Sequence, residues 1–227
     1  MADLFASPDD AAAGGAPDTA PLADRLRPRT LADVVGQEHL TGPDGAIGRM
    51  VAAGRLSSII FWGPPGTGKT TISRLLAHAV GMRFEPISAV FSGVADLKKV
   101  FAAAKDHARH GEKTLLFVDE IHRFNRAQQD GFLPFVERGT VTLVGATTEN
   151  PSFALNAALL SRAQVLILQR LDHEALGTLL DKAEELEGPL PLTAEARDAL
   201  VASADGDGRF LLNQAETLYN AKIEEPL

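Results

Sequence analysis

The chain has 227 residues, 45% of them hydrophobic, so it can bury the core of one large domain or of a main domain with a small one beside it. It contains no cysteine, which excludes disulfides and thiolate zinc sites. The net charge of −8 argues against a surface built for non-specific binding of nucleic acid, so any DNA contact must be local.

The composition of the N-terminal region predicts a disordered leader. It also indicates a cytoplasmic protein. Its first five residues are acidic where a signal peptide would be basic, and no apolar run approaches membrane-spanning length. Residues 6–21 are almost entirely Ala, Gly, Pro, Asp, Ser and Thr, which cannot bury enough apolar surface to offset the entropy lost on ordering. We therefore expect a leader over residues 1–20. A short amphipathic helix is predicted over residues 46–53.

A phosphate-binding motif, G-x-x-x-x-G-K-[ST], follows the first predicted strand. Residues 57–62 are β-branched and aromatic, as in a buried strand, and apolar residues recur at helical spacing after Lys69. Lys69 is expected to reach the β- and γ-phosphates of a nucleoside triphosphate, and the Thr70 hydroxyl to ligate Mg²⁺. The nucleotide-binding residues predicted here are Gly63, Pro64, Pro65, Gly66, Thr67, Gly68, Lys69, Thr70 and Thr71.

A short strand over residues 83–87 and a helix over residues 94–110 come next. The helix carries three lysines, Lys98, Lys99 and Lys105. Residue types alone favour a solvated helix face over a basic strip that contacts a nucleic-acid backbone.

The following strand begins at Thr114 and ends in two carboxylates. Asp119 would hold hydrated Mg²⁺, and Glu120 would orient and polarise the attacking water. An acidic strand end is common by itself, but one downstream of a phosphate loop at ordinary αβ spacing favours phosphoryl chemistry. Asn125 is predicted to cap a helix with a reciprocal glutamine, and Pro134 predicts a kink or break in that helix.

Two more strands are predicted, over residues 141–148 and 165–168, with a short helix over residues 155–162 between them. Five apolar strands separated by helices predict an α/β fold with a five-stranded parallel sheet covered by helices on both faces. From residue 171 the strands stop, and three helical segments follow, over residues 172–186, 193–204 and 209–223. We thus expect three parts: a leader (1–20), an α/β nucleotide-binding domain (21–170) and a small all-α lid domain (171–227).

These motifs resemble those of the AAA+ P-loop ATPases: the phosphate loop, Asp119 with Glu120, the strand-end Thr148, Arg162 and Arg209. Within them, the chain is similar to the family of replication-associated recombination proteins, the bacterial relatives of the Werner-helicase-interacting ATPase. The resemblance spans residues 21–222. It is carried by Gly-Gln-Glu-His-Leu (36–40), Asp-Glu-Ile-His-Arg-Phe-Asn (119–125), and Gly-Ala-Thr-Thr-Glu-Asn-Pro-Ser-Phe (145–153) with Leu-Leu-Ser-Arg (159–162), and the last of these stretches is the most specific.

The resemblance implies roles for individual residues. Thr148 matches sensor 1, which contacts the γ-phosphate or the attacking water, and Arg162 matches the arginine finger that reaches a neighbouring subunit's nucleotide. Arg209 matches sensor 2, which reports the nucleotide state to the lid. Lys98 and Lys99 lie where clamp-loader relatives contact DNA, and the implied sheet order is 5-1-4-3-2. The segment that packs near adenine is matched by Val34, Val35 and Gly36.

The same resemblance implies a DNA-dependent ATPase that uses ATP and Mg²⁺ in replication-fork maintenance, recombination and repair. Its implied DNA partners are junctions, forks or gaps. Family members continue past the lid into a helical oligomerisation domain, so we expect this chain to be truncated before that domain. We expect a homo-oligomer at full length, with single-strand-binding protein or other replisome proteins as partners.

Other functions remain open. Holliday-junction branch-migration motors share the sequences Asp-Glu-Ile-His and Gly-Ala-Thr-Thr, but residues 149–151 and 161–162 of this chain fit such a motor less well. A clamp-loader subunit is a second possibility, although catalytic bacterial subunits usually carry zinc cysteines. A nucleotide-switched adaptor that barely hydrolyses ATP is disfavoured by an intact Glu120, Thr148 and Arg162. A small-molecule kinase is disfavoured because no acceptor-binding insert is visible.

Overall fold

The computed structural model describes residues 19–221, so the leader predicted over residues 1–20 lies almost wholly outside the described residues. The chain divides into two compact units: an α/β unit, Pro28–Asp172, and a helical unit that joins Met1–Arg27 to His173–Leu227. Within the part of the chain that is described, no helix combines the length and apolarity needed to cross a membrane.

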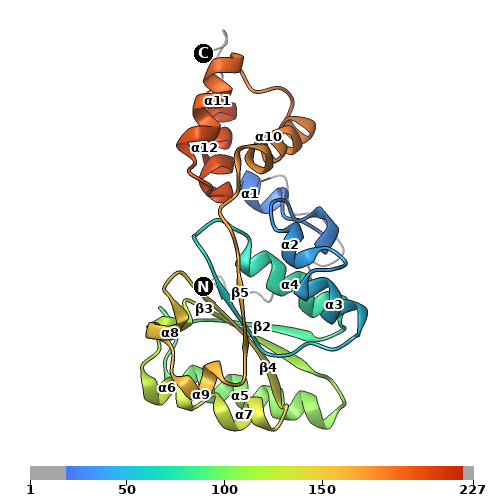
Figure 1. Cartoon of the computed structure of the whole chain (residues 1–227), viewed down its shortest axis with the longest axis vertical. Helices are drawn as coiled ribbons and strands as arrows, with labels where there is room; N and C mark the ends of the chain where they lie inside the picture. The colour runs from blue at the N-terminus through green and yellow to red at the C-terminus, as the bar shows by residue number, and fades with distance from the viewer. Residues whose placement is uncertain (1–18, 222–227) are drawn as a thin grey trace. The chain divides into compact units, whose positions relative to one another are not determined.

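The α/β unit is built on a five-stranded, all-parallel sheet in the order β2-β3-β4-β1-β5, which confirms the order implied by the family resemblance (Figure 1). Each strand lies within two residues of its predicted bounds. They are β1 (Ile59–Trp62), β2 (Arg83–Ser88), β3 (Thr114–Asp119), β4 (Val141–Thr147) and β5 (Gln164–Ile167).

Each face of the sheet is covered by a hydrophobic core. Successive side chains of each central strand point to opposite faces, so each strand contributes to both cores. Ile59 and Phe61 of β1 pack in one core with Leu76 of α4 (Lys69–Ala79), whereas Ile60 packs in the other with Phe101 of α5 (Val94–Arg109). Each of the three β1 side chains is fully buried, which contributes about 1.5–3 kcal/mol apiece. Figure 1 shows α4 and α3 (Ala46–Ala52) on one side of the sheet; on the other side lie α5, α6 (Arg126–Asp130), α7 (Leu133–Glu137) and α9 (Ala157–Leu160).

The helices of this unit connect and cover the strands. The longer ones are α3 (Ala46–Ala52), α4 (Lys69–Ala79) and α5 (Val94–Arg109). The short ones are η2 (Leu31–Asp33), α2 (Glu38–Thr41), η3 (Ile121–Arg123), α6 (Arg126–Asp130), α7 (Leu133–Glu137), α8 (Pro151–Ala154) and α9 (Ala157–Leu160).

The predicted break in the helix after Asn125 is confirmed. Asn125 caps α6 by accepting from the Gln128 backbone N–H at 2.9 Å, and Gln128 Oε1 accepts from the Asn125 N–H at 3.0 Å. Helix α6 ends at Asp130, and Pro134 lies in the first turn of α7, where its missing N–H costs no helical hydrogen bond. Helix α8, which the sequence did not predict, begins with Pro151 after its cap Asn150.

The helical unit consists of α10 (His173–Glu187), α11 (Ala194–Ser203) and α12 (Gly208–Asn220), together with α1 (Leu22–Arg25). Here the structure differs from our expectation, which placed residues 21–27 in the α/β domain. Leu22 is fully buried and its N–H donates to Glu216 Oε1 of α12 at 3.0 Å, while Arg25 forms an ion pair with Glu187 of α10. These partners lie far from residues 21–27 in the sequence, so no local pattern could predict the contacts.

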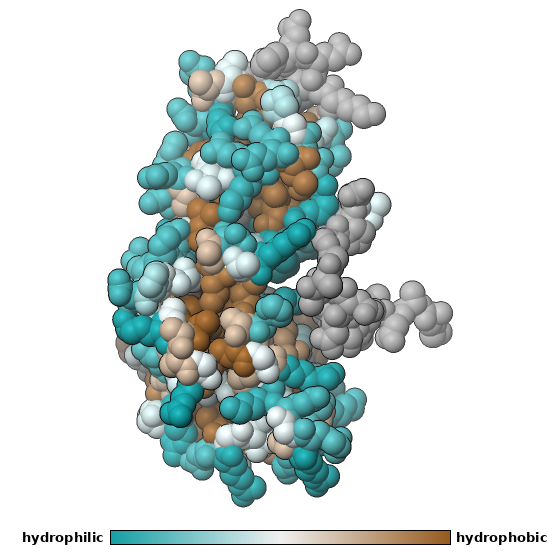
Figure 2. All heavy atoms as spheres, turned by 90° about the vertical axis from the view of Figure 1, so that its right-hand side faces the viewer, coloured by the Kyte–Doolittle hydropathy of each residue, from teal (hydrophilic) through white to brown (hydrophobic). Residues whose placement is uncertain are grey.

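The surface of each unit is that of an ordinary folded protein. On the face drawn in Figure 2, hydrophilic side chains predominate and smaller apolar areas lie among them. The most exposed large apolar side chains are Phe91, after β2, and Phe153, in α8, at 89% and 90% exposure.

Candidate nucleotide-binding site

The candidate site lies at the carboxyl edge of the sheet. Trp62 at the end of β1 pairs with Thr147 at the end of β4, and Ser88 at the end of β2 pairs with Asp119 at the end of β3. Because all strands run parallel, the phosphate loop after β1, the carboxylates after β3 and the hydroxyls after β4 meet at this one edge.

The phosphate loop connects β1 to α4, as predicted. Gly66 and Gly68 have φ values of +68° and +95°, a left-handed conformation that residues with a side chain adopt only at a cost. Gly63 is required for a different reason: a Cβ there would lie 2.5 Å from the backbone oxygen of Leu168, just after β5. The loop therefore depends on its glycines for backbone conformation and for close packing on the sheet.

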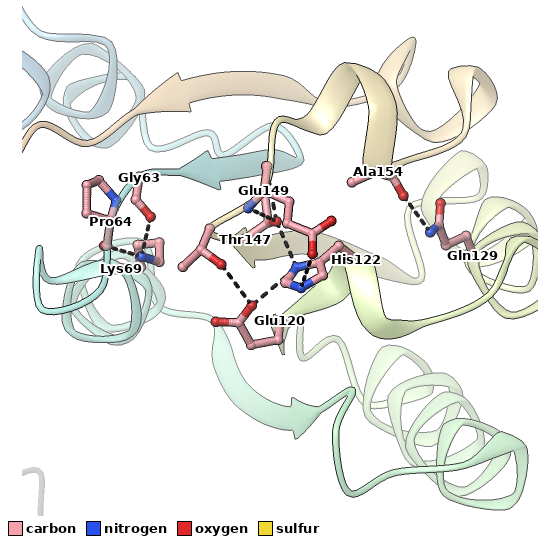
Figure 3. Close-up of polar contacts among 10 residues, drawn as sticks. Gly63, Pro64, Lys69, Glu120, His122, Gln129, Thr147, Glu149 and Ala154 are labelled. Atoms are coloured by element: carbon pink, nitrogen blue, oxygen red, sulfur yellow. Dashed lines mark hydrogen bonds and ion pairs between the residues drawn. The ribbon is translucent and has the colours of Figure 1, made fainter.

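Lys69, at the start of α4, folds back onto this loop (Figure 3). Its Nζ donates to the carbonyl oxygens of Gly63 at 2.8 Å and Pro64 at 2.6 Å, and the residue is only 9% exposed. The Thr67 hydroxyl also donates to the Pro64 oxygen, at 2.9 Å. A phosphate oxygen is a stronger partner for an ammonium than a carbonyl, so Lys69 is placed to exchange these contacts for a nucleotide.

Thr70 and Asp119 fit a magnesium ion bound together with a nucleotide. Thr70 lies in the first turn of α4 and Asp119 ends β3. A hydroxyl and a carboxylate are hard oxygen ligands, and Mg²⁺ takes few protein ligands because it keeps several waters and adds substrate phosphates. Among residues 19–221, no three His, Cys, Asp or Glu side chains group into a metal site of protein ligands alone, so phosphate oxygens would have to complete the shell.

Glu120 directly follows β3 in a left-handed backbone conformation, with φ 52° and ψ 45°. A non-glycine residue adopts this conformation at a cost of roughly 1 kcal/mol or more, and such residues concentrate at functional sites. Its Oε2 accepts from the Thr148 hydroxyl at 3.5 Å, a long contact. The structure thus brings together the predicted water-orienting carboxylate and the predicted sensor 1.

His122 connects the two strand ends, although the sequence had suggested no role for it. Its side chain is 4% exposed, and its Nδ1 lies 2.9 Å from Thr147 Oγ1 and 3.2 Å from Glu120 Oε2. Its Nε2 lies 3.3 Å from Glu149 Oε1 (Figure 3). Thr147 is fully buried, whereas Thr148 is exposed beside Glu120. This network depends on the left-handed turn at Glu120, which no pattern in the sequence predicts.

The segment predicted to pack near adenine is tied to the end of β5. Gln37 is fully buried; its Nε2 donates to the Gln169 oxygen at 2.8 Å, and its Oε1 accepts from the Gln169 N–H at 3.1 Å. Val34 is buried at 6% exposure, Val35 is partly exposed, and Gly36 has φ +75°. Gln37 therefore fixes this segment to the residues that follow β5, and the contact of the segment with adenine stays a prediction.

Arg162 is engaged within its own chain. Its Nε and Nη2 donate to Glu137 Oε1 at 2.8 and 2.6 Å, and its Nη1 donates to the Ala158 oxygen at 2.7 Å and to Ser161 Oγ at 2.9 Å. Glu137, the last residue of α7, is a partner that the sequence did not predict. The Arg162 side chain is nonetheless 37% exposed, as a residue that contacts a second molecule must be.

The remaining predicted residues lie on other elements. Arg209 is in the first turn of α12, in the helical unit. Lys98 and Lys99 are exposed on α5, and Lys99 Nζ lies 3.7 Å from Asp96 Oδ1, so the basic strip is partly neutralised by its own helix. Lys98 also borders a groove of about 640 Å³ between α5 and helices α6 and α7, which none of the phosphate-loop residues line.

Comparison with known proteins finds a matching family model and several similar proteins. Residues 59–171 match the family model of the ATPase family associated with various cellular activities (AAA). A protein of Coxiella burnetii named replication-associated recombination protein A is 48% identical over 218 residues, which cover 92% of this chain and 48% of that protein. ATPase WRNIP1 of Dictyostelium discoideum is 42% identical over 91% of this chain and 24% of its own.

Among solved structures, the RuvB Holliday junction branch migration motor of Thermotoga maritima superposes with a TM-score of 0.72. It is 25% identical, and the match covers 89% of this chain and 69% of that one. The chain spans about half the length of the curated bacterial relative that it matches.

Proposed function

Because this chain belongs to the AAA family of ATPases, in the group of replication-associated recombination protein A, we propose that it binds ATP with Mg²⁺ and hydrolyses it in response to DNA. The observation that carries the proposal is the convergence, at one sheet edge, of the phosphate loop with Lys69, the carboxylates Asp119 and Glu120, and the Thr148 hydroxyl.

ATP binding follows from the phosphate loop. Its backbone N–H groups and the N-terminus of α4, a helix of 11 residues, would receive the phosphates, and Lys69 would leave the Gly63 and Pro64 oxygens for the β- and γ-phosphates. Thr70 and Asp119 would hold Mg²⁺, which when bound neutralises part of the phosphate charge.

Hydrolysis would occur by in-line attack of water on the γ-phosphorus. Glu120 would orient the water and take up its proton as the new P–O bond forms. The bond from the γ-phosphorus to the β–γ bridging oxygen breaks, and ADP leaves with that electron pair. Thr148, 3.5 Å from Glu120, would hold the water or a γ-phosphate oxygen.

Two arginines, Arg162 and Arg209, would have further roles in the nucleotide cycle. We infer that Arg162 acts on a neighbouring subunit's nucleotide, since the family's finger works in trans and this residue is partly exposed. Arg209 would report the nucleotide state to the helical unit. The role of Arg162 presupposes a homo-oligomer.

The DNA-related role is proposed from the relatives. We infer action at forks, gaps or junctions, in replication-associated recombination, with replisome proteins such as single-strand-binding protein as partners. The exposed Lys98 and Lys99 on α5 would contact the DNA backbone.

The test is steady-state ATP hydrolysis by the longest natural form of the protein, without DNA and with single-stranded, blunt duplex, forked and gapped DNA. We expect stimulation by at least one DNA. Hydrolysis that no DNA stimulates would refute DNA dependence, and ATP binding without hydrolysis would favour the nucleotide-switched adaptor.

A Holliday-junction motor is the second candidate, because the fold superposes on the RuvB motor with a TM-score of 0.72. A four-way junction is therefore added to the assay. Stimulation by that junction alone, together with movement of its branch point, would favour the motor over the fork-associated ATPase.

A further inference from the structure

His122 is a buried histidine at the centre of the candidate site. It lies two residues after Glu120, in η3, and its side chain is 4% exposed. Both ring nitrogens face oxygen atoms, with Glu120 Oε2 and Thr147 Oγ1 near Nδ1 and Glu149 Oε1 near Nε2. A histidine buried among three polar partners is held in one orientation.

The hydrogen-bond pattern assigns the proton on Nδ1. Thr147 Oγ1 accepts from the Glu149 backbone N–H at 3.0 Å and donates its own hydrogen toward the Glu149 carbonyl oxygen at 3.3 Å. We assign the donor to the ring, because a hydrogen on Nδ1 serves both nearby oxygens, Thr147 Oγ1 at 2.9 Å and Glu120 Oε2, and leaves the hydroxyl hydrogen for the Glu149 oxygen. The same N–H then points to the Glu120 carboxylate as its second acceptor, at 3.2 Å.

The Glu120 side chain has few other restraints. Its contact with the Thr148 hydroxyl is 3.5 Å long, so the closest described polar partner of its carboxylate is His122. The left-handed turn at Glu120, continued by η3 through the Arg123 N–H donating to the Glu120 oxygen at 2.8 Å, brings both side chains to the same side of the chain.

We propose that His122 is a positioning residue that orients the Glu120 carboxylate and fixes it to the end of β4 through Thr147 and Glu149. The proposal rests on the proposed hydrolysis, because it gives Glu120 the task of orienting water. Displacing a reacting group by about 1 Å costs roughly a hundred-fold in rate, so loss of the Nδ1 contact should lower kcat about 10- to 100-fold. Affinity for ATP should stay unchanged, because the described polar contacts of His122 are with Thr147, Glu120 and Glu149 and not with the phosphate loop or Lys69.

Two variants separate the ring nitrogens. His122→Asn places an amide N–H near the position of Nδ1, and His122→Gln places one near that of Nε2. If Nδ1 positions Glu120, the Asn variant should keep kcat within about three-fold of the natural protein and the Gln variant should lose at least ten-fold. Both should bind a non-hydrolysable ATP analogue with unchanged Kd and unfold at similar temperatures.

A double-mutant cycle gives a second readout. In a Glu120→Gln background, the His122→Gln change should not lower the residual single-turnover hydrolysis further, because the carboxylate that His122 orients is gone. Equal kcat in the Asn and Gln variants, a parallel loss of ATP affinity, or additive effects with Glu120→Gln would each overturn the positioning role. Absence of hydrolysis by the natural protein would instead refute the proposed function itself.

Discussion

Replacing Glu137 by glutamine should release Arg162 and raise its availability to a neighbouring subunit. In the single chain the guanidinium gives two hydrogen bonds to Glu137 Oε1, at 2.8 and 2.6 Å. To reach another subunit's nucleotide it must first break them. On the proposed role of Arg162, Glu137 would compete with the γ-phosphate for the same cation.

The size of the effect follows from exposure. The Arg162 and Glu137 side chains are 37% and 49% exposed, and ion pairs this accessible to water contribute about 0.2–1 kcal/mol. Since about 1.4 kcal/mol corresponds to ten-fold, Glu137→Gln should raise activity per chain up to about five-fold where subunit contact is limiting. The bond from Arg162 to the Ala158 oxygen survives the change and keeps the rise modest.

The assay is ATP hydrolysis per chain as a function of protein concentration. The Glu137→Gln curve should lie above that of the natural chain at low concentration, and Arg162→Ala should abolish both the rise with concentration and the gain. Glu112→Gln is the matched control, because it removes the same charge from an exposed turn. A lower activity in Glu137→Gln would refute competition and show that Glu137 orients the finger. An equal gain in the Glu112 variant would assign the effect to net charge.

Three further outcomes are expected. Reversing Lys98 and Lys99 to glutamate should weaken DNA binding and flatten its dependence on salt, which a salt titration measures; an unchanged slope would make these lysines a solvated face. Gly63→Ala should lower the free energy of unfolding by about 1–3 kcal/mol, because the new Cβ meets the Leu168 oxygen at 2.5 Å; an unchanged denaturant midpoint would contradict this packing. Burial, and then the charges of Glu184 and Glu187, raise the pKa of Tyr219, the chain's single tyrosine, from 10.0 to about 12. The protonated Tyr219 therefore stabilises the folded state fully below pH 10, and this stabilisation is lost as pH rises towards 12. The ultraviolet absorbance of the phenolate measures this pKa, and ionisation of Tyr219 in the folded protein near pH 10 would contradict the raised value.

Most of the fold was predictable because its information is local. Five apolar strands with helices between them specify a parallel sheet, and the family resemblance supplied the strand order that the structure has. The assignment of residues 21–27 was wrong for the opposite reason. Leu22 is held by Glu216, 194 residues away, and only the folded chain brings them together.

The candidate site divides in the same way. The phosphate loop and the Asp119-Glu120 pair are contiguous motifs, and the structure places them at one sheet edge. The roles of individual residues stay predictions. His122 and Glu137 were missed because each depends on a tertiary contact: His122 on the left-handed turn at Glu120, and Glu137 on the approach of α7 to Arg162.

The most direct test of an ATP-hydrolysing site compares two variants in one experiment that measures ATP affinity by calorimetry and turnover by phosphate release. Lys69→Ala removes a phosphate contact and should weaken ATP binding. Glu120→Gln alters only the group proposed to orient water, so it should bind ATP as the natural protein does and lose turnover. Equal loss of affinity in both variants, or full turnover in Glu120→Gln, would contradict the assignment of phosphate binding to Lys69 and water activation to Glu120.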